Sequence, residues 1–549
     1  MPTSSKTDCL IVGAGPIGLT LAVELQRFGL ACRIIDQAAA PTDKSKALVL
    51  WPRSLELFDR AGLAGEFVAA GMWASGARMF GNGQTLAHIE IQRDDSAFTR
   101  PLMIAQCETE RVLNQALAQR GLPVERSVTL VKCTQTGDAV TSTLRHADGR
   151  EEIVTSAWLG GCDGSHSTVR KQLGIEFTGD FEPNDWILAD VHIDGPICPD
   201  EISAFWHSEG VAIFFPFAPG RFRVIADMGK APGTDKPADP TLAQAQAIVD
   251  RRAMPGLRLH DPVWLAGFRI HERKVSEYGR GRAFLCGDAA HIHSPAGGQG
   301  MNTGMQDAFN LAWKLALVHH GRAPRSPLLD TYSTERGAVG DMVLHNAGLF
   351  TRVAMIRNPA LQYLRNHLIG FATQFTAVQQ RAIANLTEMA VHYPKSPLNG
   401  EDPGPAWRGG IYAGDRLPDA ELLDPKTGQT TRLLAAISGS EHTLLLMSAD
   451  PAALAALLPE AQSLAAAFGL FVQILSVQFQ PLTSQSPDKD AVSPDINILF
   501  DSQNELRDRL GLRATAVALI RPDGYLAFRG HASSLPKLRE HLVTYLSPA

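Results

Sequence analysis

The sequence predicts an α/β protein, in which a Rossmann-like domain carries an inserted antiparallel sheet and is followed by a thioredoxin-like domain. Residues 8–36 have the pattern of a strand, a helix and a second strand with short connections, as in a parallel sheet. Residues 181–275 alternate between apolar and polar positions in runs separated by proline and glycine, which is typical of antiparallel strands. Residues 405–549 form a separate strand-and-helix pattern with a hairpin turned at Asp523-Gly524.

These patterns divide the chain into three domains. Residues 1–180 and 276–396 make up the Rossmann-like domain and its helical extension, 181–275 the inserted sheet domain, and 405–549 the C-terminal domain. The length of 549 residues and the hydrophobic content of 45% suffice for two or three buried cores. The C-terminal domain contains no cysteine, so dithiol chemistry is excluded there whatever its fold.

The composition argues against several classes of partner. A net charge of −6 with 20% charged residues gives no sign of nucleic acid or of an anionic membrane as a partner. The first residues lack the charged and apolar regions of a signal peptide, and the longest apolar stretch, around 452–477, is interrupted too early to span a bilayer. The seven cysteines occur without a CxxC pair, which favours reduced thiols over disulfides or a zinc site. We therefore expect a cytoplasmic protein without a metal ion.

A glycine motif opens the first helix. Gly13 permits a tight turn, Gly15 lets the backbone approach a pyrophosphate, and Gly18 lets helix and strand pack closely. Asp36 ends the second strand, where its carboxylate can accept hydrogen bonds from both ribose hydroxyls. An acid at this position argues against a 2′-phosphate, so the dinucleotide at this site is FAD or NAD. Pro16, Ile17 and Gln37 belong to the same predicted site.

Two later segments decide between these cofactors. They are residues 161–170 (GCDGSHSTVR) and 282–291 (RAFLCGDAAH), and the loop 294–302 (SPAGGQGMN) follows the second. These segments resemble the DG and GD motifs of the p-hydroxybenzoate-hydroxylase-like group A flavoprotein monooxygenases. The resemblance covers about residues 6–395. With its thioredoxin-like C-terminal domain, the chain is most similar to the phenol hydroxylase and 3-(3-hydroxyphenyl)propionate hydroxylase branch, together with polyketide and antibiotic hydroxylases.

The resemblance implies an activity. NADH or NADPH would transfer a hydride to non-covalently bound FAD, and the reduced flavin would react with O2 to form a C4a-hydroperoxide that hydroxylates a phenolic or polycyclic aromatic substrate. The sequence does not distinguish NADH from NADPH. An FAD-dependent oxidase or dehydrogenase without oxygen insertion is the alternative on the same fold. A non-catalytic binding protein would not need the glycines and the acid of the GD segment.

The resemblance also assigns residues to the cofactor. Asp288 would accept hydrogen bonds from ribityl hydroxyls, with Gly287 leaving room for them, and the helix that begins near Gly300 would direct amide donors at the flavin N1/O2 edge. Asp163 would serve both FAD and NAD(P)H. Further predicted FAD contacts are Lys46, which stands where the family usually has arginine, and Arg53, Gln106, Pro295, Gly298, Met301 and Asn302. His166 and Arg170 are the predicted contacts to the phosphates of NAD(P)H.

An apolar wall is predicted for the substrate. Simple hydroxybenzoate hydroxylases carry an arginine near the position of Phe217, and its absence here predicts a neutral or larger aromatic substrate. His207 is the predicted catalytic residue, because an imidazole can help to deprotonate a substrate hydroxyl near neutral pH. The C-terminal domain is expected to pack against the FAD domain or to support a homodimer. The wall residues are Trp186, Trp206, Phe214, Phe215, Pro216 and Phe217, with Pro295.

Overall fold

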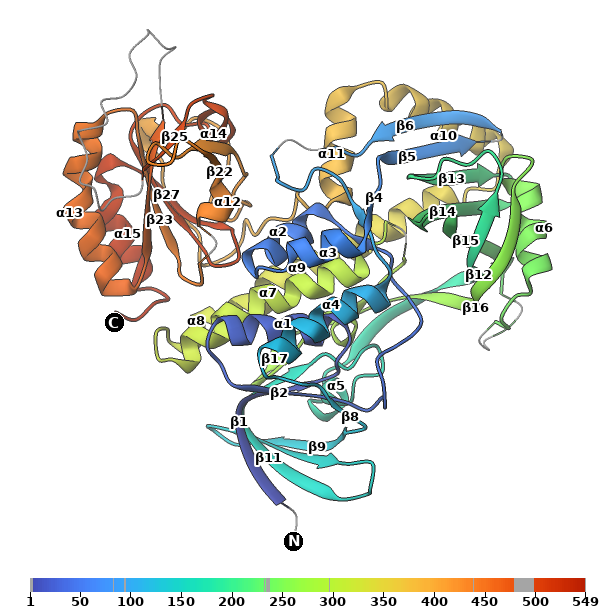
Figure 1. The fold of residues 1–549 in the computed structure, drawn as a ribbon, viewed down its shortest axis with the longest axis horizontal. Coiled ribbons are helices and arrows are strands. Elements are labelled where there is room, and N and C mark those ends of the chain that lie inside the picture. Colours follow the sequence, from blue (N-terminus) through green and yellow to red (C-terminus); the bar gives the residue numbers. More distant parts are fainter. Residues whose placement is uncertain are drawn as a thin grey trace.

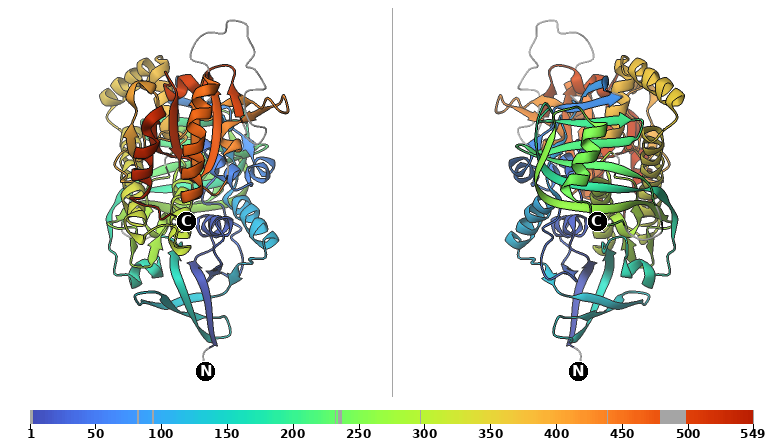
Figure 2. Two further views of the ribbon diagram at one scale, coloured as in Figure 1. Left: turned by 90° about the vertical axis from the view of Figure 1, so that its left-hand side faces the viewer. Right: turned by 90° about the vertical axis from the view of Figure 1, so that its right-hand side faces the viewer.

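The computed structural model has the predicted fold class, with the C-terminal unit and the inserted sheet at opposite ends of the molecule (Figures 1 and 2). The nucleotide-binding sheet lies below the helices between them. The structure describes residues 3–81, 83–92, 95–231, 233, 237–295, 297–437, 439–477 and 498–548. The predicted domain boundaries themselves stay predictions.

The first sheet brings distant parts of the sequence together at one edge. β1 (Thr3–Val12) is parallel to β2 (Cys32–Asp36) and to β11 (Glu151–Gly161), which is also parallel to β18 (Ala283–Leu285). The carboxyl ends of these strands therefore lie side by side, where parallel α/β sheets bind their ligands. The remaining strands of the sheet are β8 (Glu125–Arg126), β9 (Thr129–Gln135), β10 (Val140–Arg145) and β17 (Gly279–Arg280).

Helices cover the first sheet, and α7 (Gly300–His319) packs along α1 (Pro16–Arg27). Almost every residue of α7 before Leu317 is buried, because several helices of this region pack against it. The other elements of this region are α2 (Pro52–Arg60), α3 (Ala64–Ala70), α4 (Gln106–Gln119), α5 (Thr168–Gln172), the 3-10 turn η1 (Gly287–Ala289), α8 (Arg325–Leu328), α9 (Asp330–Ala354) and the small sheet of β3 (Val49–Leu50), β4 (Met72–Trp73) and β7 (Leu102–Met103).

The inserted sheet is larger than the predicted segment 181–275. Its order is β19-β16-β12-β15-β14-β13-β5-β6, so β5 and β6 join it from an earlier part of the chain and β19 from a later one. Helix α6 packs on this sheet, and α10 packs against β6. The elements are β5 (Gly76–Gly81), β6 (Gln84–Glu90), β12 (Phe177–Asp194), β13 (Glu201–His207), β14 (Gly210–Ala218), β15 (Arg221–Lys230), α6 (Leu242–Arg252), β16 (Arg258–Val275), β19 (His291–Ile292), α10 (Pro359–Ala372) and α11 (Thr376–Leu386).

The C-terminal unit has its own mixed sheet, ordered β20-β27-β26-β23-β24-β25-β21-β22. The predicted hairpin is present, and Gly524 adopts the positive φ of +79° that its turn requires. One apolar cluster joins Trp313 of α7 to the core of this unit, so the unit packs against the FAD domain. Its elements are β20 (Gly400–Asp402), η2 (Gly404–Ala406), β21 (Glu421–Leu423), β22 (Thr430–Arg432), α12 (Leu433–Ala436), β23 (Thr443–Ser448), α13 (Pro451–Phe468), β24 (Phe471–Val477), β25 (Ile498–Asp501), α14 (Glu505–Leu510), β26 (Ala516–Ile520), β27 (Leu526–His531), η3 (Ala532–Ser534) and α15 (Leu535–Leu542).

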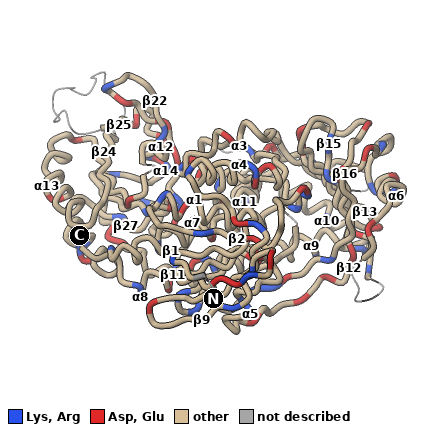
Figure 3. The backbone as a smooth tube through the Cα atoms, turned by 60° about the horizontal axis from the view of Figure 1, so that its bottom comes forward, with Lys and Arg blue, Asp and Glu red and all other residues tan. Residues whose placement is uncertain are grey.

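Charged residues of both signs are interspersed along the chain (Figure 3). Among the described residues, no helix combines the length and the apolar character that crossing a membrane requires. All seven cysteines are free thiols.

Candidate functional site

The glycine motif forms a packed turn with one open position. A Cβ atom on Gly13 would lie 2.3 Å from the carbonyl oxygen of Cys162, and one on Gly18 would lie 1.9 Å from the carbonyl oxygen of Gly13. Neither site therefore admits a side chain. A Cβ atom on Gly15, at the N-terminus of α1, would meet no heavy atom within 4 Å. This open position, at the positive end of a helix dipole, has the space and the charge that a pyrophosphate needs.

Asp36 is oriented beside this turn by backbone donors. Its carboxylate accepts hydrogen bonds from the N–H groups of Ala14 at 2.7 Å and Ala38 at 2.8 Å. The acid at the end of β2 is therefore held next to the glycine turn at the end of β1, and its oxygens still have lone pairs for ribose hydroxyls. Gln37, the next residue, is exposed.

Asp288 presents an accessible carboxylate deep in the molecule. Its neighbours Gly287 and Ala289 are buried, whereas Asp288 itself is exposed to an opening between the elements. Burial raises the pKa of the Asp288 carboxyl, and the positive charges of His291 and Lys46 oppose this rise. Lys46 is itself exposed. The carboxylate of Asp288 and the ammonium of Lys46 therefore lie within electrostatic range of each other, and their contacts with the flavin stay predictions.

The start of α7 is fixed by side-chain hydrogen bonds. Asn302 accepts from the backbone N–H of Trp51 at 2.9 Å and donates to the carbonyl of Val49 at 2.9 Å. The indole of Trp51 donates to the carbonyl of Gly297 at 3.1 Å. The side chain of Asn302 is therefore used to hold the loop, while the first N–H groups of α7, from Gly300 and Met301, remain for a ligand.

Two predicted cofactor residues have other roles. Arg53 is fully buried, where it pairs with Glu56 at 2.9 Å, donates to the carbonyl of Asp523 at 2.7 Å and lies over the ring of Tyr525. The guanidinium of Arg53 thus binds the C-terminal unit, and its contact with FAD stays a prediction. Such a role could not be recognised before the contact with the distant hairpin was known.

Arg170 is likewise engaged by the protein itself. Its guanidinium donates to the carbonyls of Ala289 at 2.9 Å and Ser165 at 2.7 Å and packs on Phe177. It therefore joins the DG segment to the GD segment, and its contact with NAD(P)H stays a prediction. His166, in contrast, is exposed and stays a prediction.

Asp163 and Gln106 are oriented by local contacts. Asp163 accepts from the hydroxyl of Ser167 at 2.5 Å and from the backbone N–H of Thr168 at 2.6 Å, so it caps α5. Gln106 accepts from the N–H of Ala47 at 3.1 Å and thereby supports the loop that carries Lys46. Any direct contact of these side chains with FAD stays a prediction.

An apolar pocket adjoins the start of the loop that leads to α7. Ser294 and Pro295 of the loop line it together with the predicted wall residues Trp186 and Phe215. The hydroxyls of Ser294 and Thr351 lie 3.0 Å apart. In the described part of the chain, none of the lining residues carries a charge. The other lining residues are Val211, Ile213, Ile225, Ile270, Phe350, Thr351 and Ala354.

Other predicted substrate residues lie outside this pocket. Because side chains alternate along β14, Phe214 points into the core of the sheet while Phe215 faces the pocket. Phe217 packs in an apolar cluster with Trp51 beside the loop, and Trp206 packs behind the pocket on Phe350 at 5.7 Å between ring centroids. Neither lines the pocket. Pro216 is buried in β14 and likewise does not line it.

The catalytic prediction for His207 is not supported by the geometry. His207 lies at the turn between β13 and β14, and its Nδ1 accepts from the backbone N–H of Glu209 at 3.3 Å. It is not among the residues that line the pocket. The distance in sequence from the wall residues is short, but the hairpin directs this ring away from them.

Sequence reasoning missed the polar residues that hold the site together. Arg223 forms a buried ion pair with Asp190 at 2.7 Å and donates to the carbonyls of Ser45 and Lys46, which fixes the loop that carries Lys46 to the inserted sheet. On α7, Asp307 accepts from the backbone N–H of Gly287 at 3.0 Å and contacts His291 at 2.7 Å. Asp307 is the one acidic residue of the helix at 300–319, and this was the signal that could have identified it.

These features define a protein that binds a dinucleotide such as FAD across the ends of a parallel sheet, beside an apolar pocket. A family model described as "FAD binding domain" matches residues 6–347. The chain is 37% identical over 549 residues to 6-methylpretetramide 4-monooxygenase from Streptomyces rimosus, covering 98% of this chain and 94% of that protein. It is 32% identical over 533 residues to pentachlorophenol 4-monooxygenase from Sphingobium chlorophenolicum, covering 96% and 94%.

A solved structure gives the same result. OxyS anhydrotetracycline hydroxylase from Streptomyces rimosus superimposes with a TM-score of 0.76 and 28% identity, covering 99% of this chain and 100% of that chain. The chain belongs to the FAD binding domain family. It is an FAD-dependent monooxygenase with NAD(P)H as co-substrate, as predicted, and the oxidase alternative is not favoured.

Proposed function

We propose that this enzyme hydroxylates a phenolic or polycyclic aromatic ring bound in the apolar pocket. The observation that carries the proposal is that Trp186 and Phe215 of the inserted sheet face the same pocket as Ser294 and Pro295 of the loop that leads to α7. The cavity between these side chains is about 20 Å³, so an aromatic ring would bind there only after the two walls move apart. The names of the relatives support this substrate class, since they specify pentachlorophenol and 6-methylpretetramide as substrates.

The proposed placement of FAD rests on the carboxylates of Asp36 and Asp288 and on the open space at Gly15. The pyrophosphate would pass Gly15, the adenosine ribose would bind Asp36, and the ribityl chain would bind Asp288. Bound FAD supplies the acceptor for the hydride of NAD(P)H and the site of reaction with O2. No linkage to the protein is needed for this chemistry, and we expect the cofactor to be held non-covalently.

The pocket residues orient the substrate and exclude water. The apolar walls disfavour a charged ring substituent, because a carboxylate transferred into this pocket would lose its hydration without gaining a cationic partner. The hydroxyls of Ser294 and Thr351 are buried and bonded to each other, and Thr351 also donates to the carbonyl of Ala347 at 2.9 Å, so they add no charge to these walls. These features support a neutral aromatic substrate, and the walls keep water from the oxygen-transfer step.

A substrate panel tests this proposal. Phenols, naphthols and polycyclic phenolic compounds would be added to the FAD-loaded enzyme with NADH or NADPH and 18O2, and products would be analysed by mass spectrometry. We expect at least one compound to accelerate NAD(P)H oxidation and to gain one 18O atom. Accelerated NAD(P)H oxidation with stoichiometric hydrogen peroxide and no oxygenated product across the whole panel would contradict hydroxylation.

The remaining assignments are proposals of smaller scope. His166 is the proposed contact to NAD(P)H, and His166→Ala is expected to raise the KM for NAD(P)H without changing FAD affinity. Seven free cysteines support a cytoplasmic location, where thiols stay reduced. A homodimer stays a prediction. The exposed Leu364, Leu368 and Phe371 of α10 offer an apolar surface for a second copy, and sedimentation velocity tests it.

A further inference from the structure

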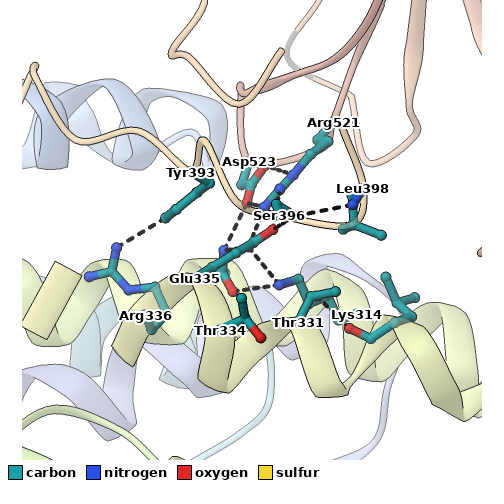
Figure 4. Close-up of polar contacts among 12 residues, drawn as sticks. Lys314, Thr331, Thr334, Glu335, Arg336, Tyr393, Ser396, Leu398, Arg521 and Asp523 are labelled. Atoms are coloured by element: carbon teal, nitrogen blue, oxygen red, sulfur yellow. Dashed lines mark hydrogen bonds and ion pairs between the residues drawn. The ribbon is translucent and has the colours of Figure 1, made fainter. Parts of the chain in front are cut away.

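The C-terminal hairpin inserts charged residues into a buried cluster on the FAD domain (Figure 4). Arg521, just after β26, donates to both carboxylate oxygens of Glu335 on α9, at 2.7 and 2.9 Å. Lys314 on α7 donates to the same carboxylate at 2.7 Å. The side chains of all three residues are fully buried. Helices α7 and α9 are therefore joined through a carboxylate whose second cation comes from the C-terminal unit.

Asp523 completes this cluster from the same hairpin. It pairs with Arg521 at 2.6 Å and accepts from the indole N–H of Trp313 on α7 at 3.1 Å. The cluster thus contains two cationic and two anionic side chains, shared between the hairpin and the two helices. Charges at this depth are stable only while each keeps its partner, so loss of the arginine would leave carboxylates without full compensation.

The next residue of α9 extends this network to the proposed FAD site. Arg336 donates to the carboxylate of Asp307 at 2.7 Å and to the backbone carbonyl of Thr303 in the first turn of α7 at 2.9 Å. Asp307 in turn accepts from the backbone N–H of Gly287, one residue before Asp288. The orientation of α9 therefore controls two parts of the site, the start of α7 and the turn that carries Asp288.

Tyrosines link the two halves of the network a second time. The hydroxyl of Tyr393 accepts from Arg336 at 3.0 Å, and its ring packs on Tyr525 of the hairpin with 4.4 Å between centroids. Arg521 lies over the ring of Tyr393 at 5.3 Å. A change in the hairpin would therefore reach Arg336 by two routes.

We propose that Arg521 of the C-terminal unit is a positioning residue for the cofactor, which fixes the first turn of α7 and the turn of Asp288 through α9. This inference rests on the placement of FAD proposed above. The C-terminal unit then has a part in building the FAD site, through α9.

The test compares two arginines that cross the same interface. Arg416 is also buried and pairs with Glu56 on α2 and with Asp95, and its guanidinium makes no hydrogen bond to the described residues of α9 or α7. Arg521→Met and Arg416→Met would be prepared as full-length proteins, and FAD affinity, the flavin midpoint potential and thermal stability would be measured. We expect Arg521→Met to weaken FAD binding at least tenfold and to make the potential more negative, because a displaced α7 N-terminus stabilises reduced flavin less well.

Arg416→Met is expected to lower thermal stability while leaving FAD affinity within about threefold and the potential unchanged. Arg521→Lys keeps the charge but loses the bidentate fork, so it should show an intermediate effect on both flavin readouts. If Arg521→Met does not fold, Arg521→Lys is compared with Arg416→Met in its place.

Two results would overturn the proposal. One is an Arg521 variant that is less stable but binds FAD with wild-type affinity and potential. The other is equal loss of FAD affinity in Arg416→Met and Arg521→Met, which would show a general effect of loosening the interface. FAD affinity and the flavin midpoint potential are measured without an aromatic substrate. The test therefore remains valid even if no hydroxylated product is found.

Discussion

The side chain of Asn302 and the backbone of Trp51 are hydrogen-bonded at 2.9 Å, which joins the start of α7 to the start of α2. The same amide donates to the carbonyl of Val49 at 2.9 Å. Asn302 therefore satisfies both the N–H of Trp51 and the carbonyl of Val49, at the end of β3. The loop between Gly297 and Gly300 is thereby held against β3, beside the expected pyrimidine edge of the flavin.

Removing this amide should disturb the loop. Asn302→Ala leaves the buried Trp51 N–H and Val49 carbonyl unsatisfied, at a cost of about 1–3 kcal/mol for each group. We expect a lower unfolding temperature and an FAD Kd at least tenfold higher, measured by fluorescence titration of the apoprotein. Asn114→Ala, which removes an amide bonded within α4, serves as the control and should leave the FAD Kd unchanged. Equal affinities for the two variants would contradict the role given to Asn302.

Two glycines of the first motif should respond differently to substitution. Gly15 has ordinary backbone angles, φ −77° and ψ −176°, and open space at its Cβ position. Gly15→Val should therefore fold but should bind FAD at least tenfold more weakly, which corresponds to about 1.4 kcal/mol. Gly18→Ala should be unstable even as apoprotein, because its Cβ would overlap the carbonyl of Gly13. Circular dichroism melting and FAD titration separate the two effects, and a Gly15→Val protein with wild-type FAD affinity would place the pyrophosphate elsewhere.

A bulky side chain in the pocket should prevent substrate binding without changing FAD binding. Ile213 lines the pocket from β14, and Ile213→Trp would fill it. We expect loss of substrate-stimulated NAD(P)H oxidation with an unchanged flavin absorption spectrum. Val263→Trp adds the same ring at an exposed position of β16 and should behave as wild type. If Ile213→Trp retains stimulation by the same aromatic compound, the substrate binds outside this pocket.

Glu388 should make the stability of the protein depend on pH. Burial raises the pKa of the Glu388 carboxyl to about 8, and this carboxyl accepts from the hydroxyl of Thr303 at 2.8 Å and the amide of Gln306 at 2.5 Å. The folded pKa lies above the unfolded value, so the protonated form is favoured in the fold. The stabilisation is complete below pH 4.5 and is lost as the pH rises through about 8, by on the order of a few kcal/mol.

Glu388→Gln resembles the protonated form and should remove this dependence. Urea unfolding midpoints of Glu388→Gln and of the wild type would be measured between pH 5 and 9. The two midpoints should be similar at low pH, and the variant should become more stable than the wild type at high pH. Glu540→Gln, at an exposed position of α15, should keep the wild-type profile. Parallel profiles for Glu388→Gln and the wild type would show that Glu388 does not titrate in this range.

The sequence was informative where a residue type is imposed by local geometry. Gly13 and Gly18 were predictable because no side chain fits their positions, and the hairpin at Asp523-Gly524 because its turn needs a positive φ. The alternating pattern of β14 identified Phe215 but could not decide which face of the strand would meet the pocket. Phe214, its neighbour, lies in the core for this reason.

The arginines were harder to assign. Arg53 and Arg170 follow the expected motifs, but each is bound by carbonyls and aromatic rings from segments that the local sequence does not specify. The roles of Asp307 and Arg521 depend on the packing of α7, α9 and the C-terminal hairpin. Such contacts have no local signature, because their partners lie between 20 and more than 180 residues away.

The parallel pairing of β11 with β18 has a consequence for biosynthesis. Leu159 is adjacent to Ala283 in this pairing, and strands β12 to β16 of the inserted sheet are synthesised between them. Asp288 and helix α7 leave the ribosome only after strands β12 to β16. The nascent chain therefore lacks a complete binding surface for FAD before that point. Since long-range pairings form slowly, capture of the cofactor should follow the release of most of the polypeptide. Flavin supply during expression would then act on a chain that is more than half synthesised.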